Sequence, residues 1–352
     1  MNILDTSNID RLQDIISSAA RISVAVHIHP DGDALGSGIA AITFLQSIGK
    51  DAVLILPHMY PESLGFLVTD DIAGSIIVYE NESERAVARI NESDTVFCQD
   101  FNDFSRTGDM GQALAESGAV KVLIDHHLYP DTESFTLTFS EPDTVSSTSE
   151  LLYYILMALP QTGGDAKKLP AAAATALMAG MTTDTNNFAN STHPGTFRMA
   201  SELIAAGVDR DMLLGNLFNN FRENRIRLMA KFLKDMKITE DGVAYMVLDR
   251  KTIKKYGIQD GETEGFVNIP LTINKVRMSI FMRQDKDRFR VSIRSKRGVS
   301  ANICAKRYFN GGGHELASGG RMMIPSELRN AGEAARYIEK VTHEYFNDTA
   351  ND

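Results

Sequence analysis

Residues 21–50 read R-I-S-V-A-V-H-I-H-P-D-G-D-A-L-G-S-G-I-A-A-I-T-F-L-Q-S-I-G-K, and this stretch decides the fold. Its first part, residues 21–29, is rich in β-branched side chains and predicts a short strand that ends at a polar loop. Residues 36–50 have the apolar content and the spacing of a helix. The stretch therefore predicts a strand, a polar turn and a helix in direct succession.

The first half of the chain repeats this alternation. Near-continuous apolar strands separated by helices indicate a parallel sheet with helices on both faces, and such sheets bind ligands beyond the carboxyl ends of their strands. The fold class predicted for this half is therefore α/β. Further strands are expected at residues 51–57, 74–79, 94–100 and 119–125, and helices at 82–90 and 110–118.

The second half has a different pattern. Residues 146–237 are mostly helical in spacing, and the charged, amphipathic end of this region is expected to connect two domains. Alternating strands then predict a smaller α/β domain with a mixed sheet, closed by a helix near residues 333–345. The predicted organisation is an N-terminal domain at 1–220, a linker helix at 221–238 and a C-terminal domain at 239–348.

Composition limits the class of protein. At 352 residues, with 43% hydrophobic and 23% charged side chains, the chain suits two globular domains. No apolar run approaches the ~18 residues that span a bilayer, and the first residues lack the pattern of a secretory signal. Cys98 and Cys304 are the two cysteines, and neither has a metal-binding spacing. We therefore expect a cytoplasmic protein without disulfides and without a membrane partner.

The charge is distributed unevenly. A net charge of −10 argues against a protein that coats long duplex nucleic acid. Residues 283–307, however, contain nine Lys or Arg and two Asp, so this segment carries +7 and the rest of the chain −17. An acidic body with one basic segment predicts carboxylate-rich chemistry in one place and an anion-binding surface in another.

The polar turn of the opening stretch contains the first candidate site residues. His27 leaves the strand, and Asp31 and Asp33 follow in a turn where both carboxylates can point toward one small volume. Hard divalent cations prefer carboxylate oxygens, and imidazole adds affinity for Mn²⁺, Fe²⁺ or Zn²⁺. An alternative is that this Asp-Gly-Asp turn only caps the following helix.

Three further places have the same character. Asp100 ends a predicted strand, His126 and His127 follow another, and Asp184 follows the small-residue helix at 171–180. Of two neighbouring histidines only one easily faces a given point, so either His126 or His127 would be a ligand. Asp184 could instead form a cap or a local turn.

Together these residues make a set of four carboxylates and two histidines, which suits two divalent cations ~3.5–4 Å apart. Such a pair lowers the pKa of a bound water toward ~7 and clamps a phosphate oxygen. The chain has neither a G-x-S-x-G motif nor a P-loop, so hydrolysis by attack of a metal-bound hydroxide on a phosphoester is expected. The predicted metal ligands are His27, Asp31, Asp33, Asp100, Asp184 and one of the two histidines His126 and His127.

The order of these motifs resembles the DHH phosphoesterases, which are named for the tripeptide Asp125-His126-His127. H-x-x-x-D-x-D, a lone strand-end Asp, D-H-H and a later T-D-T appear in the family's order. The C-terminal N-G-G-G-H-E-L-A-S-G-G is similar to the domain that accompanies them in NrnA-like enzymes, the nanoRNase and phosphoadenosine-phosphatase group. The resemblance covers residues 21–323.

The resemblance implies a role for each residue. His27 and Asp31 would hold one Mn²⁺, and Asp33, His126 and Asp184 the other, with Asp100 as the bridge. His127 would face the substrate phosphate as acid or donor, while Asp125 would orient His126. His29 stands where many relatives carry Asn and is not expected to be a ligand. Arg106 could reach a phosphate or remain solvated.

The C-terminal domain is expected to hold the substrate. Glycines let backbone N–H groups approach a phosphate or a base, and arginine fits a phosphate with two hydrogen bonds. A simple flexible turn is the alternative for the glycines. The predicted substrate contacts are Arg294, Ser295, Asn302, Gly311, Gly312, Gly313 and His314.

The function that the resemblance implies is hydrolysis of short oligoribonucleotides and 3′-phosphoadenosine 5′-phosphate by an exonuclease-like, two-metal enzyme. Short RNA or small nucleotides would be the partners, and a homodimer is compatible with the sequence. One alternative is a phosphodiesterase for cyclic di-AMP or pApA. Others are an exopolyphosphatase or pyrophosphatase, and a non-catalytic nucleotide-binding protein, against which the complete ligand set argues.

Overall fold

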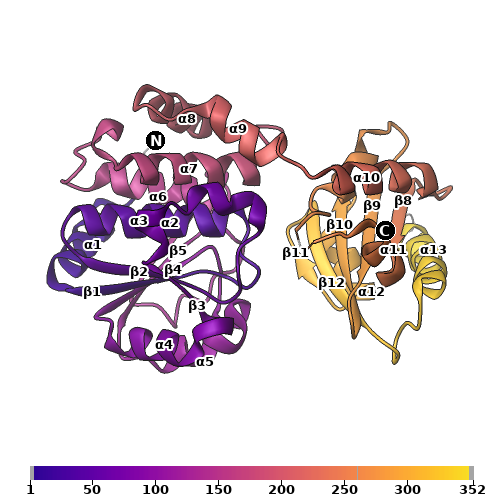
Figure 1. The fold of residues 1–352 in the computed structure, drawn as a ribbon, viewed down its shortest axis with the longest axis horizontal. Coiled ribbons are helices and arrows are strands. Elements are labelled where there is room, and N and C mark those ends of the chain that lie inside the picture. The colour runs from indigo at the N-terminus through magenta and orange to yellow at the C-terminus, as the bar shows by residue number, and fades with distance from the viewer. Residues whose placement is uncertain (1–3, 260, 349–352) are drawn as a thin grey trace. The chain divides into compact units, whose positions relative to one another are not determined.

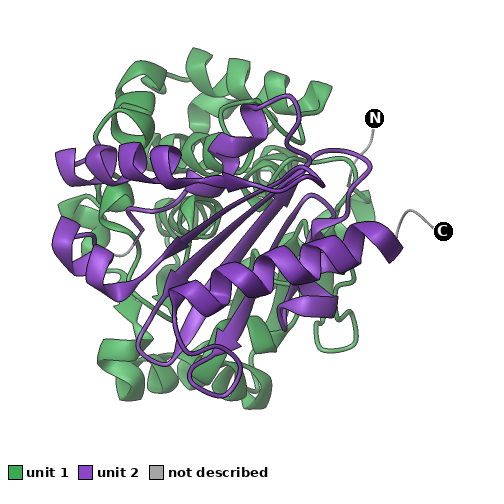
Figure 2. Ribbon diagram, turned by 90° about the vertical axis from the view of Figure 1, so that its right-hand side faces the viewer, with its two compact units in different colours: residues 1–220 green, residues 221–352 purple. Residues whose placement is uncertain are grey.

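The computed structural model describes residues 4–259 and 261–348. The chain divides into two compact units, unit 1 at residues 1–220 and unit 2 at residues 221–352 (Figure 2). Within the described residues, no helix is both long and apolar enough to cross a membrane.

Unit 1 is built on a six-stranded sheet in the order β3-β2-β1-β4-β5-β6, and every neighbouring pair is parallel. The predicted α/β fold is therefore confirmed. The strand β6 was not foreseen from the sequence. The strands are β1 (Arg21–Ala25), β2 (Asp51–Leu56), β3 (Ile76–Val78), β4 (Thr95–Gln99), β5 (Val120–Asp125) and β6 (Leu137–Ser140).

Helices cover both faces of this sheet (Figure 1). One core contains buried side chains of the helices α1, α2, α6, α7, α8 and α9, and the opposite core contains side chains of α4 and α5. The helices are α1 (Thr6–Ser18), α2 (Gly32–Ser47), α3 (Asp70–Ala73), α4 (Tyr79–Glu92), α5 (Gly111–Glu116), α6 (Thr148–Ala158), α7 (Ala171–Asp184), α8 (Pro194–Ala205) and α9 (Arg210–Phe218).

The helices α2 and α7 approach each other closely because small residues face each other. A Cβ on Gly36 would lie 2.5 Å from the carbonyl oxygen of Ala176, and one on Gly32 would overlap the side chain of Thr183. This is why α7 is rich in Ala and Gly, as its sequence predicted. The contact brings the end of α7, with Asp184, next to the start of α2.

Unit 2 contains a mixed sheet in the order β11-β12-β10-β9-β8-β7, in which β8 and β9 are parallel and the other pairs antiparallel. Residues 285–287 join β9 to β10. The strands are β7 (Lys237–Ile238), β8 (Val243–Leu248), β9 (Met278–Gln284), β10 (Arg288–Ser295), β11 (Gly312–Gly313) and β12 (Ala317–Met323).

The side chains of β8 point alternately to the two faces of the sheet and pack into two hydrophobic cores. Val243 and Tyr245 pack with α12 and α13, whereas Met246 and Leu248 pack with Leu228 of α10 and its neighbours. The segment expected to be a linker helix is therefore a packed part of unit 2. The helices of unit 2 are α10 (Glu223–Asp235), α11 (Arg250–Tyr256), α12 (Ala301–Tyr308) and α13 (Ala331–Asp348).

Candidate metal centre

The residue His27 follows β1 at the carboxyl edge of the parallel sheet. Its Nδ1 lies 2.8 Å from the carbonyl oxygen of Ile28, which can only accept, so Nδ1 carries the proton. The other ring nitrogen, Nε2, points to two carboxylates and lies 3.3 Å from Oδ2 of Asp100 and 3.8 Å from Oδ1 of Asp31. Burial lowers the pKa of His27, but the hydrogen bonds with these carboxylates outweigh it and raise the pKa well above its usual value, so Nε2 carries a proton that a bound cation would replace.

The two carboxylates of the Asp-Gly-Asp turn have separate surroundings. Asp31 is the N-cap of α2, and its Oδ1 accepts from the backbone N–H groups of Asp33 and Ala34 at 3.0 and 3.1 Å. Asp31 therefore caps α2, and the same oxygen also faces His27. Asp33, in the first turn of α2, is only 1% exposed.

Asp100 lies between the two halves of the candidate site. It follows β4 with a positive φ of 62°, and its N–H donates to the carbonyl oxygen of Ile124. Few non-glycine residues adopt this conformation, and the strain is tolerated where surrounding structure holds it. His27 lies on one side of the carboxylate, and Nε2 of His126 lies 3.6 Å from Oδ1 on the other.

Of the groups of donor atoms that contain Asp100, two consist of predicted ligands alone. One group is His27, Asp31 and Asp100, and the other is Asp33, Asp100 and His126; within each group the donor atoms lie within 4.8 Å of one another. Asp184 reaches the second group from the end of α7, with Oδ2 3.6 Å from Nε2 of His126. All six predicted ligands are therefore brought together, and their oxygen and imidazole donors suit divalent cations such as Mn²⁺.

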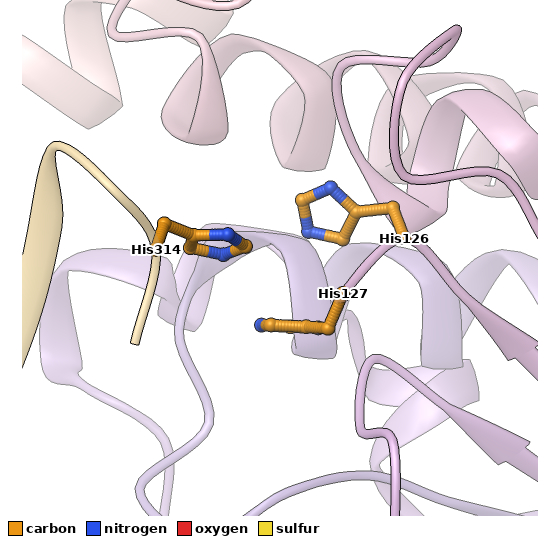
Figure 3. A group of neighbouring side chains, drawn as sticks. All are labelled: His126, His127 and His314. Carbon is orange, nitrogen blue, oxygen red and sulfur yellow. The ribbon is translucent and has the colours of Figure 1, made fainter. Parts of the chain in front are cut away.

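The two neighbouring histidines have different partners. Their rings extend to the same side of the chain after β5 (Figure 3), with centroids 4.8 Å apart and planes at 63°. His126 faces Asp33, Asp100 and Asp184. His127 instead places Nδ1 2.7 Å from Oδ1 of Asp125.

The position of Asp125 corrects one expectation. Asp125 was expected to orient His126, but its hydrogen bond is with His127, whose backbone N–H also donates to it at 3.1 Å. The strand β5 ends at Asp125, and the turn that follows brings the N–H and the ring of His127 to the Asp125 carboxylate. Arg106 is half-buried, and its charge lowers the pKa of His127, so it lies within electrostatic reach of that ring.

The electrostatics are those of carboxylates crowded in a buried place. Burial, and then repulsion by Asp100, raise the pKa of Asp33 well above its usual value. Burial and repulsion by Asp33 raise the pKa of Asp184 in the same way. Asp100 keeps a lowered pKa because its hydrogen bond with His27 and the charges of nearby histidines outweigh the effect of burial. Bound cations would relieve this repulsion.

Comparisons with known proteins show the family of the chain. The DHH family, N-terminal domain, matches residues 21–181, and the DHHA1 domain matches residues 240–340. The bifunctional oligoribonuclease and PAP phosphatase NrnA of Bacillus subtilis is 28% identical over 83% of this chain and 86% of its own length. A probable NrnA of Streptococcus mutans is 30% identical over the same shares. The chain belongs to the DHH phosphoesterase family.

Other DHH relatives differ in their described activities. The cyclic-di-AMP phosphodiesterase GdpP of Geobacillus thermodenitrificans is 27% identical over 95% of this chain and 49% of its own length. A crystal structure of an exopolyphosphatase-related protein from Bacteroides fragilis is 33% identical, covers 98% of both chains and has a TM-score of 0.89. RecJ from Thermus thermophilus in complex with Mn²⁺ shares the fold, at 14% identity and a TM-score of 0.61, over 98% of this chain and 55% of its own.

The DHHA1 part of the chain, in unit 2, contains the predicted substrate contacts. Gly311 lies so close to β12 that a Cβ would be 1.9 Å from the carbonyl oxygen of Gly319, and Gly313 has a φ of 140°. The side chain of Asn302 donates to the carbonyl oxygen of Gly313. Gly312 has space for a Cβ at ordinary contact distance. The glycines therefore form a tight connection to β12 rather than a loose turn.

Other predicted contacts in unit 2 are tied into its structure to different degrees. Ser295 is only 6% exposed, and its hydroxyl donates to the carbonyl oxygen of Val299 at 2.6 Å, so it supports the fold there. Arg294 is half-buried, with one guanidinium nitrogen 3.0 Å from its neighbour's carbonyl oxygen. His314, also drawn in Figure 3, follows the glycines and is half-buried.

The first turn of α6 is part of the DHH site that the sequence did not reveal. The backbone N–H of Thr148 donates to Oδ2 of Asp33 at 2.7 Å, and that of Ser149 to Oδ1 at 2.9 Å. The Thr148 hydroxyl donates to Oδ1 of Asp100 at 3.1 Å. The pattern Ser147-Thr-Ser-Glu150 is a helix-start signature, and it was the available signal.

Proposed function

We propose that the chain hydrolyses phosphoester bonds in short oligoribonucleotides and in 3′-phosphoadenosine 5′-phosphate, using two divalent cations, most readily Mn²⁺. His27 and Asp31 would hold one cation, and Asp33, His126 and Asp184 the other. Asp100 would touch both. The observation that carries this proposal is the position of Asp100, whose carboxylate belongs to both donor groups.

When bound, such a pair of cations neutralises phosphate charge and makes a water nucleophilic near neutral pH. The protein's own residues would prepare the site for this. Asp100 stays ionised because His27 faces it, and the α6 backbone orients Asp33. The Nδ1 atom of His27 is occupied by Ile28, so only Nε2 is presented to a cation.

His127 is proposed to donate a proton or a hydrogen bond to the phosphate or the leaving oxygen. Burial lowers its pKa, but the hydrogen bond with Asp125 and the charge of Asp100 outweigh this and raise the pKa above its usual value. A raised pKa keeps a larger fraction of the imidazole protonated at neutral pH. Arg106 is proposed to add positive charge for the phosphate.

The two predicted domains would have separate roles. Unit 1 would carry out the reaction, and the DHHA1 part would bind the nucleotide through Arg294, Asn302, His314 and the glycine connection. The similarity to NrnA over 83% of the chain supports oligoribonucleotides and 3′-phosphoadenosine 5′-phosphate as substrates. The similarity to GdpP over 95% of the chain supports a second candidate, cyclic di-AMP or its linear product pApA.

One assay separates these candidates. Purified protein with Mn²⁺ is offered a five-nucleotide RNA, pApA, 3′-phosphoadenosine 5′-phosphate, cyclic di-AMP and pyrophosphate at equal concentrations. We expect turnover of the first three, and no turnover by Asp100→Asn on any of them. Cyclic di-AMP cleaved far faster than the RNA would replace the first candidate with the second. Pyrophosphate as the best substrate would overturn both.

A further inference from the structure

A polar cavity of about 400 Å³ lies at the same edge of the unit 1 sheet as the candidate metal centre. It is lined by residues that follow three neighbouring strands: Ile28 after β1, His58 after β2 and Tyr79 after β3. Ligands of parallel α/β sheets bind beyond the carboxyl ends of the strands, which is where this cavity is. Its volume is in the range of small-molecule sites.

The backbone connects this cavity to the metal centre. Ile28 directly follows His27, and its N–H donates to the carbonyl oxygen of Arg106 at 2.8 Å. Thr107, the next residue, is buried and also lines the cavity. A group bound in the cavity would therefore lie beside a metal ligand and beside the proposed phosphate-facing arginine.

The imidazole of His58, which lines this cavity, stacks on that of His29. The rings of His29 and His58 have centroids 4.2 Å apart and planes at 17°. The backbone N–H of His29 donates to Nδ1 of His58 at 3.2 Å. His29 holds a positive φ of 52°, a conformation that few side chains adopt without a functional or structural reason. None of the proposed catalytic roles uses this pair.

The charge of the lining indicates what kind of group would bind. Glu80 and Asp109 are acidic, and the Tyr79 hydroxyl donates to the carbonyl oxygen of Asp109 at 3.3 Å, so its oxygen can still accept. Carboxylates repel a phosphate but accept hydrogen bonds from hydroxyl and amino groups. A flat aromatic ring beside stacked imidazoles is favourable as well. Ribose hydroxyls and a base combine these two properties.

We propose that this cavity is a nucleoside subsite, in which the base of the nucleoside next to the scissile phosphate lies against the imidazole of His58. The ribose hydroxyls or an amino group of the base donate to Glu80 or Asp109. The inference rests on the proposed function, since it assigns part of a nucleotide substrate to this cavity. In this arrangement, contacts with one nucleoside beside the scissile phosphate contribute to substrate binding independently of the metal ligands.

Two substitutions test the subsite without disturbing the fold. His58→Asn removes the imidazole that lines the cavity but keeps a side-chain acceptor for the backbone N–H of His29. Ser83→Phe fills the cavity from an exposed position on α4, and Glu84→Phe places the same ring at a neighbouring exposed position that does not line it. Steady-state kinetics are measured on pApA with Mn²⁺, and on two analogues of pApA that each lack one base.

For pApA we expect KM to rise about fivefold or more in His58→Asn and Ser83→Phe, since stacking of one base is lost, with kcat close to wild type. Glu84→Phe should behave as wild type. With one of the two abasic analogues the His58→Asn effect should disappear. An unchanged KM for pApA in both variants, while wild type turns it over, would overturn the subsite alone. A wild-type protein inactive on every nucleotide would overturn the proposed function instead.

Discussion

Thr148 offers the sharpest test of how unit 1 prepares the site. Its hydroxyl is fully buried and donates to Oδ1 of Asp100 at 3.1 Å, and Asp100 is 2% exposed. Thr148→Val keeps the shape of the side chain but removes this donor. A hydrogen bond to a charged group contributes about 1.5–3 kcal/mol, and loss of a residue that orients a metal ligand costs about 10- to 100-fold in metal affinity or activity. The expected result is therefore Mn²⁺ affinity lower by about 10- to 100-fold.

The assay is Mn²⁺ titration by calorimetry on the full chain, with Thr148→Ser as the rescue because it keeps the hydroxyl. Thr162→Val is the matched control. The hydroxyl of Thr162 is also fully buried and donates to the carbonyl oxygens of Leu156 and Leu159 at 2.6 and 3.1 Å, with no metal-ligand contact. Thr162→Val should lower stability but leave Mn²⁺ affinity unchanged. Equal Mn²⁺ affinity in Thr148→Val and wild type would refute the positioning role.

The remaining predictions concern charge, packing and proton transfer. Asp184→Asn should weaken Mn²⁺ binding and raise the melting temperature of the EDTA-treated protein at pH 8. A carboxyl whose native pKa is raised contributes stability below its unfolded pKa of about 4 and loses it as the pH rises through the native pKa. A gain in melting temperature at pH 4 as large as the gain at pH 8 would contradict this. Gly36→Ala should lower the free energy of unfolding by about 1–3 kcal/mol, because its Cβ would lie 2.5 Å from a backbone oxygen. Gly74→Ala is the control, since a Cβ there would have no atom within 4 Å, and denaturant unfolding should show almost no change in its stability. Asp125→Asn should shift the alkaline limb of the kcat profile to lower pH, since the hydrogen bond that raises the pKa of His127 is weakened; an unshifted limb would remove His127 from proton donation.

Short sequence patterns predicted the helices and strands that are determined by the residues within them. The strand-turn-helix of residues 21–50 and the small-residue helix at 171–180 were recognisable because period and composition decide them. The strand β6 was missed because its four residues carry too short a pattern, and α10 was assigned to a linker because amphipathicity does not say which sheet it covers.

In the candidate site, too, local sequence predicted some features and not others. The six ligands could be proposed because each stands at an element end, where side chains converge in a parallel sheet. The hydrogen bonds that Asp33 receives from Thr148 and Ser149 span 115 and 116 residues of sequence, so no local pattern could predict them. The resemblance implied His126 as the partner of Asp125, whereas the local turn after β5 makes His127 its hydrogen-bond partner. Ser295 has the residue type of a phosphate contact, but its burial is a property of the folded unit 2.

The central claim is that Asp100 joins two cation sites. Anomalous diffraction at the manganese absorption edge, from crystals of the full chain soaked in Mn²⁺, tests it most directly. Two peaks are predicted, one beside His27 and Asp31 and one beside Asp33, His126 and Asp184, with the Asp100 carboxylate in contact with both. Peaks at other residues, or a single peak that Asp100 does not touch, would contradict the account.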